Sequence, residues 1–255
     1  IEGETPWPTQ PFPTRPAPFD YQGVTIDDLV DFTPEIRNLA IAAIEPFRIG
    51  PMYTPHSQRG TVFRPGSSAG SWSGAAVDPE TGMLYVPSTN QFAVKQFREP
   101  EPGEDASLRF IERRGSARPL MPQGLPLFKP PYSRMTAIDM NTGEHVWMQP
   151  MRNGDRMRNL PMLRDLDLPP LGGDSTRAGP LLTKTLLIYA LTAGGTDDGP
   201  RLVAFDKATG DEMASVDLPG GAIGAPMTYM VGGRQYIALT IGGSRVPELI
   251  ALALP

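Results

Sequence analysis

Side chains suited to acid–base, nucleophilic or metal chemistry are few in this sequence and stand far apart. The two histidines, His56 and His145, do not form a metal pair, and the lack of cysteine excludes thiolate metal sites and cysteine nucleophiles. The pair Asp197-Asp198 in GGTDDGP predicts a hairpin turn, and the acidic residues of LRDLDLPP are expected to be solvated loop charges. These side chains alone predict neither a complete metal site nor a paired-carboxylate site.

The composition indicates short strands joined by turns. Of 255 residues, 30 are proline and 27 are glycine, which are too many helix breakers for long helices over most of the chain. A formal net charge of −5 without a basic run argues against nucleic acid as the main partner. No apolar run of about 18 residues occurs, so no membrane span is predicted. The start IEGETPWPTQPFP lacks an initiator Met and a signal-peptide pattern, and we expect a processed product or part of a longer protein.

One short pattern, Asp-x-x-Thr-Gly between two strand-like runs, occurs three times, at 78–82, 139–143 and 206–210. The Asp side chain can accept backbone N–H groups across the turn, and the final Gly suits a left-handed conformation. We expect each turn to link two strands of one four-stranded antiparallel blade. Each interval between turns is expected to hold one blade plus a long irregular insertion, at 98–132 and at 151–179.

Three other elements are predicted along the chain. A helix is expected in DFTPEIRNLAIAAIEPF, capped by Thr33 and ended by Pro46. The pair Gly232-Gly233 in VGGRQY predicts a hairpin. The proline-rich residues 1–22 are expected to lie extended on a surface, anchored by three aromatic side chains, Trp7, Phe12 and Phe19.

The wider pattern Ala-x-Asp-x-x-Thr-Gly-x-x-x-Trp resembles the tryptophan-docking motif of the quinoprotein alcohol dehydrogenases, which are eight-bladed β-propellers. The complete copy, AIDMNTGEHVW, ends at Trp147, whereas the first copy has Val86 and the third has Ala214 at the Trp position. Longer runs are similar to the C-terminal part of the membrane-bound glucose dehydrogenase branch, among them GAAVDPETGMLYVP, LPLFKPPYSRMTAIDMNTGEHVW and PMTYMVGGRQYIALTIGG. Trp147 is then expected to dock one blade on the next and to have no catalytic role.

This resemblance implies an all-β fold. Several four-stranded antiparallel blades, the C-terminal part of an eight-bladed propeller, are expected at 71–255. Residues 1–70 are expected to form an extended segment and a short helix that pack on these blades.

The resemblance also implies a cofactor chemistry. Members of the family hold pyrroloquinoline quinone (PQQ) and a Ca²⁺ ion on the propeller axis, where an Asp takes the alcohol proton while hydride passes to the quinone. The catalytic Asp and most calcium ligands belong to blades that precede the part matched here, and no segment of this chain resembles them. We therefore expect no catalytic residue and no metal ligand in this chain, and no activity from this chain alone.

Two segments are expected near the cofactor or the substrate. The family has Asn-Trp after a Gly-rich turn, and the corresponding run PGSSAGSW places Ser71 and Trp72 there as cofactor-binding residues. The alternative for Trp72 is a core residue at the start of a blade strand. A serine hydroxyl cannot replace the paired contacts of an amide, which argues against tight cofactor binding. In TIGGSRVPEL, Ser244 and Arg245 are candidates for the substrate side, and a solvated loop is the alternative.

The leading interpretation is part of a periplasmic PQQ-dependent alcohol or sugar dehydrogenase. A chain that carries the N-terminal blades is the implied partner, because an unclosed propeller leaves open strand edges. The substrate could be a sugar, a polyol or a secondary alcohol, and the electron acceptor a quinone or a cytochrome c. The alternative is a non-catalytic propeller that acts as a protein-binding scaffold, which Ser71 and the missing docking tryptophans favour.

Overall fold

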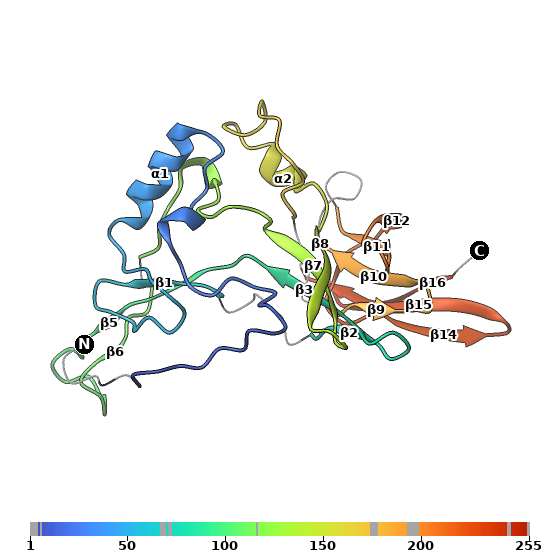
Figure 1. The fold of residues 1–255 in the computed structure, drawn as a ribbon, viewed down its shortest axis with the longest axis horizontal. Helices are drawn as coiled ribbons and strands as arrows, with labels where there is room; N and C mark the ends of the chain where they lie inside the picture. Colours follow the sequence, from blue (N-terminus) through green and yellow to red (C-terminus); the bar gives the residue numbers. More distant parts are fainter. Residues whose placement is uncertain are drawn as a thin grey trace. The chain divides into compact units, whose positions relative to one another are not determined.

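The computed structural model describes residues 5, 7–66, 70, 73–115, 117–173, 178–192, 199–243 and 246–253. Contacts within the chain define two compact units, whose elements are labelled in Figure 1. Unit 1 consists of Ile1–Pro13, Asp20–Ala69 and Asn90–Pro130, and unit 2 of Thr14–Phe19, Gly70–Thr89 and Pro131–Pro255. The division into domains 1–70 and 71–255 stays a prediction, since a compact unit need not be a domain that folds alone.

Unit 1 carries the longer helix and two small antiparallel sheets. The predicted helix is confirmed as α1 (Pro34–Ile44): the Thr33 hydroxyl oxygen accepts the Ile36 N–H at 3.2 Å, and Pro34 occupies the first position. The remaining elements of unit 1 are η1 (Ile26–Asp28), β1 (Thr61–Phe63) paired with β4 (Ala93–Lys95), β5 (Phe97–Arg98) paired with β6 (Ile111–Glu112), and η2 (Pro122–Gly124).

The three aromatic side chains expected to anchor the N-terminal segment differ in their contacts and in how far they are buried. The Phe12 ring lies 5.6 Å from the Tyr53 ring in unit 1, and Phe19 is half-buried in unit 2. Trp7 is 82% exposed, so its expected role as an anchor is wrong. The prolines hold this stretch extended, and the described residues around Trp7 are all exposed to solvent.

The described residues of unit 2 form three four-stranded sheets in which every strand pair is antiparallel, as the sequence predicts for propeller blades (Figure 1). The first sheet has the order β2 (Ala76–Asp78), β3 (Met83–Thr89), β7 (Ser133–Asp139) and β8 (Glu144–Pro150). The second has β9 (Leu181–Leu182), β10 (Leu186–Leu191), β11 (Arg201–Asp206) and β12 (Glu212–Asp217). In the third, β15 (Arg234–Gly242) pairs with β13 (Gly221–Ala222), β14 (Met227–Val231) and β16 (Glu248–Ala253). A short helix, α2 (Asp155–Arg158), follows β8.

The three Asp-x-x-Thr-Gly turns share one set of hydrogen bonds, as predicted. In each turn the Asp Oδ1 accepts the backbone N–H two residues later, at 3.1, 2.8 and 2.7 Å. The Asp carbonyl accepts the N–H of the final Gly at 2.7–2.8 Å. These glycines have positive φ angles of 71–79°, a conformation that costs a residue with a Cβ free energy; they are Gly82, Gly143 and Gly210.

The turns are distributed among the sheets differently from the expectation. Turn 78–82 joins β2 to β3 and turn 139–143 joins β7 to β8, so both lie in the first sheet, whereas turn 206–210 joins β11 to β12 in the second. The expectation of one blade plus an insertion per interval is therefore wrong for the first interval. The pattern specifies a tight turn between two strands, and it does not specify which hairpin of the sheet the turn closes. Val86, the residue at the Trp position of the first copy, consequently lies in β3, in the same sheet as Trp147.

Two apolar layers join the three sheets, and β10 contributes to both. Leu187, Tyr189 and Leu191 pack with residues of the first sheet, whereas Ile188 and Ala190 pack with residues of the third. Because successive side chains of a strand point to opposite faces, a strand between two sheets must be apolar at every position. This requirement explains the unbroken run LLIYAL.

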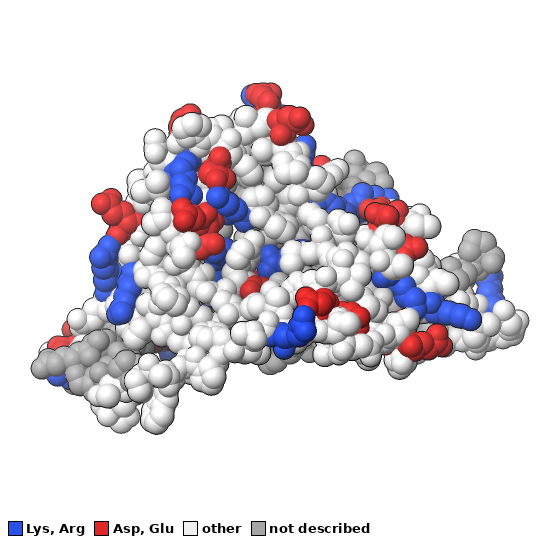
Figure 2. Space-filling model, viewed as in Figure 1, with Lys and Arg blue, Asp and Glu red and all other residues white. Residues whose placement is uncertain are grey.

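The first and third sheets also carry exposed apolar side chains. Val146 and Met148 flank Trp147 in β8 and are 53% and 43% exposed, so they point to the face opposite Trp147. In the third sheet four apolar side chains are 56–73% exposed, namely Met227, Met230, Val231 and Leu249. Lys, Arg, Asp and Glu are intermixed on the face drawn in Figure 2. Apolar sheet faces of this kind are usually covered by another sheet or chain.

Candidate functional site

The join between the first and second sheets centres on the backbone carbonyl of Lys207, in turn 206–210. This carbonyl accepts a hydrogen bond from the Tyr85 hydroxyl at 3.0 Å and one from the Trp147 indole N–H at 3.3 Å. The Trp147 ring lies against Gly210, where an added Cβ would come within 2.8 Å of Trp147 Cε3. Trp147 therefore docks the first sheet on a turn of the second, which is the role that the resemblance implied.

The Lys207 side chain adds an ion pair to the same join. Its Nζ lies 2.5 Å from Oδ2 of Asp78, which is 3% exposed. The hydrogen bond from Lys207 holds the pKa of Asp78 below its ordinary value of 3.8, aided by the Glu80 N–H and opposed by burial. This pair could not be predicted from the sequence, because the two residues are 129 positions apart and Lys207 occupies a variable position of the turn.

Replacing Asp78 with Asn is expected to make the stability of the protein less dependent on acid pH. Since the folded-state pKa is lowered, ionised Asp78 contributes stability above the carboxyl's ordinary pKa and loses it as pH falls through the folded value. The wild type should lose stability progressively as pH falls through and below the ordinary carboxyl pKa of 3.8, and Asp78→Asn should start lower and decline less steeply. Urea unfolding at several pH values measures both slopes.

The matched control for this experiment is Glu80→Gln, which removes an exposed carboxylate from the same turn. Its pH dependence should follow the wild type. Some slope should remain in every variant, because the Asn141 N–H lowers the pKa of Asp139 in the neighbouring turn. Equal slopes for Asp78→Asn and the wild type would contradict a stabilising role of the ion pair.

Segments next to all three sheets of unit 2 meet at Gly179. An added Cβ at Gly179, before β9, would come within 2.6 Å of the Ser73 carbonyl oxygen and 3.1 Å of the Ala225 Cβ. Ser73 precedes β2, and Ala225 lies between β13 and β14. Gly70 forms a bridge with Ser88, whose 2% exposed hydroxyl has no hydrogen-bond partner among the described residues. This inner edge, defined by these five residues, is made of small side chains and backbone polar groups.

A buried arginine in unit 1 precedes the Gly- and Ser-rich run that leads to Trp72. The Arg64 guanidinium is 2% exposed and lies 4.1 Å from the Tyr21 ring and 4.2 Å from the Phe128 ring. Its Nη2 forms an ion pair with Asp28 at 2.9 Å, and Nη1 donates to the Asn90 Oδ1 at 3.1 Å. Burial lowers the pKa of Arg64, and Asp28 offsets part of that shift. No signal in the sequence distinguishes this arginine from exposed ones.

The proposed site residues themselves fall outside the described part of the chain. This holds for the four expected cofactor-side and substrate-side residues and for the acidic pair of the expected hairpin, namely Ser71, Trp72, Ser244, Arg245, Asp197 and Asp198. Gly70 and Ser73 are the described residues on either side of Ser71 and Trp72 in the sequence, and both lie at the inner edge. The roles of these residues stay predictions.

The other titratable residues singled out in the sequence lie apart from one another. His145 in β8 has its Nε2 2.8 Å from the Ala17 carbonyl, and His56 in unit 1 lies between the rings of Phe63 and Phe97. The carboxylates of Asp165 and Asp167 are exposed. Within the described ranges no three His, Asp or Glu side chains could hold a metal ion together. In the same part of the chain no helix is long and apolar enough to cross a membrane.

Comparison with known proteins identifies a match along most of the chain. The family described as "PQQ: Glucose/ethanol/alcohol dehydrogenase, beta-propeller domain" matches residues 1–237. The chain is 29% identical over 272 residues to "Probable quinate dehydrogenase (quinone)" of Xanthomonas campestris pv. juglandis, covering 97% of this chain and 34% of the relative. It is 27% identical over 229 residues to "Quinoprotein glucose dehydrogenase A" of Acinetobacter calcoaceticus, covering 80% of this chain and 27% of the relative.

A third relative is likewise matched over only part of its own length. "Glycerol dehydrogenase large subunit" of Gluconobacter oxydans (strain 621H) is 27% identical over 287 residues, a match that covers 100% of this chain and 38% of the relative. The chain thus spans between about a quarter and two fifths of the length of these curated relatives.

Proposed function

This chain belongs to the PQQ-dependent glucose/ethanol/alcohol dehydrogenase β-propeller family, and we propose that it forms the C-terminal part of an enzyme that oxidises a hydroxyl group to a carbonyl. The match over residues 1–237 is the observation that carries this proposal. Relatives named for glucose, quinate and glycerol support a sugar, cyclic polyol or small polyol as the substrate class. A quinone or a cytochrome c is the proposed electron acceptor, and the periplasm is the proposed location.

We place the cofactor at the inner edge of unit 2. PQQ, when bound, supplies a quinone carbonyl carbon that accepts hydride from the substrate carbon. The Ser88 hydroxyl, which has no hydrogen-bond partner among the described residues, can hydrogen-bond a group of the cofactor beside Gly70. Trp72 and Ser71 are the proposed contacts of this chain with the cofactor, and Ser244 and Arg245 the proposed contacts on the substrate side. The catalytic Asp and the Ca²⁺ ligands are proposed to lie on the blades that this chain lacks.

The proposed partner of this chain is the polypeptide that carries the remaining blades. The described residues of unit 2 form three sheets, fewer than the roughly four to eight blades of typical propellers, and the exposed apolar residues of the first and third sheets support further blades against both. Those blades either continue the same polypeptide or form a second chain. In both cases the activity belongs to the assembly.

Expression of residues 1–255 alone is expected to give aggregated or poorly folded protein without PQQ-dependent activity. The assembled protein should show a native mass larger than this chain and should carry PQQ. With PQQ and Ca²⁺ present, it should oxidise at least one of glucose, glycerol and quinate in the presence of an artificial electron acceptor. Native mass spectrometry and a dye-reduction assay measure these properties.

The control for this assay is the same assembly without PQQ, which should be inactive. A monodisperse, cooperatively unfolding monomer of residues 1–255 would contradict the requirement for further blades. An assembly that folds and has every blade but neither binds PQQ nor oxidises these hydroxyl compounds would contradict the proposed dehydrogenase.

A further inference from the structure

Trp147 and Ala214 occupy the same place in two consecutive sheets. Trp147 in β8 pairs with Ala137 in β7, and the register of these strands shifts between Ala137 and Ile138. Ala214 in β12 pairs with Ala204 in β11, and the register shifts there between Ala204 and Phe205. The turn that precedes each residue has the same hydrogen bonds. The second sheet therefore presents a methyl group where the first sheet presents an indole ring.

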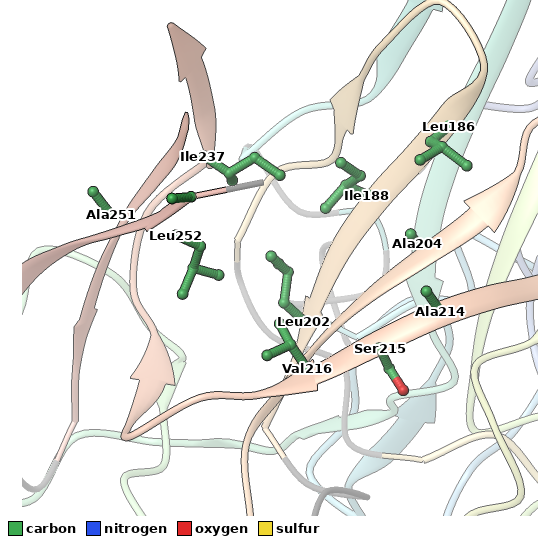
Figure 3. Close-up of a pocket in the computed structure, with 11 residues that line it drawn as sticks. Leu186, Ile188, Leu202, Ala204, Ala214, Ser215, Val216, Ile237, Ala251 and Leu252 are labelled. Carbon is green, nitrogen blue, oxygen red and sulfur yellow. The ribbon is translucent and has the colours of Figure 1, made fainter. Parts of the chain in front are cut away.

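An apolar cavity lies beside Ala214, between the second and third sheets. This Ala214 pocket has a volume of about 440 Å³ and is lined by aliphatic side chains and Ser215. Figure 3 shows Ile188, Leu202, Ile237 and Leu252 grouped around this space. Ile188 and Leu202 are each 4% exposed and form its inner part, whereas Ala214 and Ala251 are exposed at its rim. The equivalent place between the first and second sheets is filled by Trp147.

The geometry points to the Ala214 pocket as a binding site for a flat, uncharged aromatic molecule of about the size of indole. Between the first and second sheets, the equivalent position holds the indole ring of Trp147. This ring packs on Gly210 and lies 5.9 Å from the Tyr85 ring. Apolar cavities lined by aliphatic side chains can bind small aromatic molecules. This inference does not depend on the proposed oxidation.

The chemistry of the walls selects the ligand class. Aliphatic side chains on β10, β11, β15 and β16 offer dispersion contacts and no charge, so an ionised ligand would lose its hydration without compensation. The walls are strands of two sheets held by hydrogen bonds, so the cavity cannot readily collapse. The equivalent place between the first and second sheets holds the flat ring of Trp147, which favours a flat ligand over a globular one.

The test is a titration of the assembled protein with indole, followed by ligand-observed NMR. The wild type should bind with a dissociation constant on the order of 0.1–1 mM. Ala214→Trp supplies the ring covalently and should abolish binding while raising the melting temperature. Met213→Trp is the matched control, because Met213 is the neighbouring residue of β12, points to the opposite face and is 61% exposed. This variant should bind indole within twofold of the wild type.

A second variant guards against poor folding of Ala214→Trp. Ala251→Phe narrows the pocket from β16, and it should weaken indole binding about tenfold or more. Absence of indole binding to the wild type would overturn the inference and would show that another part of the assembly fills the cavity. Undiminished binding to Ala214→Trp or to Ala251→Phe would also overturn it. Equal affinity for 1-adamantanol, which is apolar but not flat, would contradict the assigned ligand class.

Discussion

Replacing Trp147 with alanine is expected to lower the free energy of unfolding of the assembled protein by about 3 kcal/mol. The substitution removes the ring that packs on Gly210 and Tyr85, and it removes the indole N–H that donates to the Lys207 carbonyl. Because the ring is only half-buried, the loss should lie at the lower end of the range for buried aromatic residues. Urea unfolding monitored by circular dichroism measures the change.

Two variants separate the contributions of packing and hydrogen bonding at Trp147. Trp147→Phe keeps a ring but lacks the donor, and it should cost about 1 kcal/mol. Val146→Ala alters the neighbouring residue on the opposite face, where a further blade is proposed to pack, and it should cost less than Trp147→Ala because it removes only two methyl groups. A loss in Trp147→Ala no larger than that in Val146→Ala would show that this residue does not hold the two sheets together.

Replacing Trp72 with alanine is expected to weaken PQQ binding to the assembled protein by about 1–3 kcal/mol, a factor of about 5 to 150. The reason follows from the proposed role, in which a flat indole stacks on the ring system of the cofactor and fixes its plane. Stability should change less than affinity does. Titration of the cofactor-free assembly with PQQ measures the dissociation constant, and thermal melting of the same samples measures stability.

The chain contains three tryptophans, which provides a matched set for this experiment. Trp7→Ala should leave both PQQ affinity and melting unchanged, because Trp7 is 82% exposed. Trp147→Ala should lower stability while sparing PQQ affinity in the protein that remains folded. If Trp72→Ala instead lost stability and kept its affinity for PQQ, Trp72 would be a core residue and this proposed cofactor contact would be withdrawn.

Local features of this fold could be predicted from the sequence because they depend on neighbouring residues. The capped helix α1 is one such feature, and the turns at 78–82, 139–143 and 206–210 are another. The hairpin at Gly232-Gly233 follows the same logic, since both residues have the positive φ angles that a two-residue turn between β14 and β15 requires.

Features that join distant parts of the chain could not be predicted in the same way. The sequence pattern does not show that turns 78–82 and 139–143 belong to one sheet. Strand pairing is decided by packing between residues that are far apart in the sequence. The ion pair between Lys207 and Asp78 has the same origin. Family resemblance supplied the expected place of Trp72, which lies outside the described residues, so its contacts stay a prediction. The exposure of Trp7 shows that an aromatic residue in a proline-rich stretch need not find a surface to pack on.

The pairing of Thr89 with Ser133 has a consequence for how proteins of this kind can diversify. The chain leaves the first sheet after Thr89 and re-enters it at Ser133, and these two residues are direct partners in the β3–β7 ladder, so their Cα atoms lie only about 4.5–5.5 Å apart. The segment between them, Asn90–Pro130 and the two residues that follow, belongs mainly to unit 1. The ladder fixes where this segment starts and finishes and imposes no length on it, and lengthening a loop costs little closure entropy. Natural variation can therefore lengthen or shorten this segment while every strand of the sheet keeps its register.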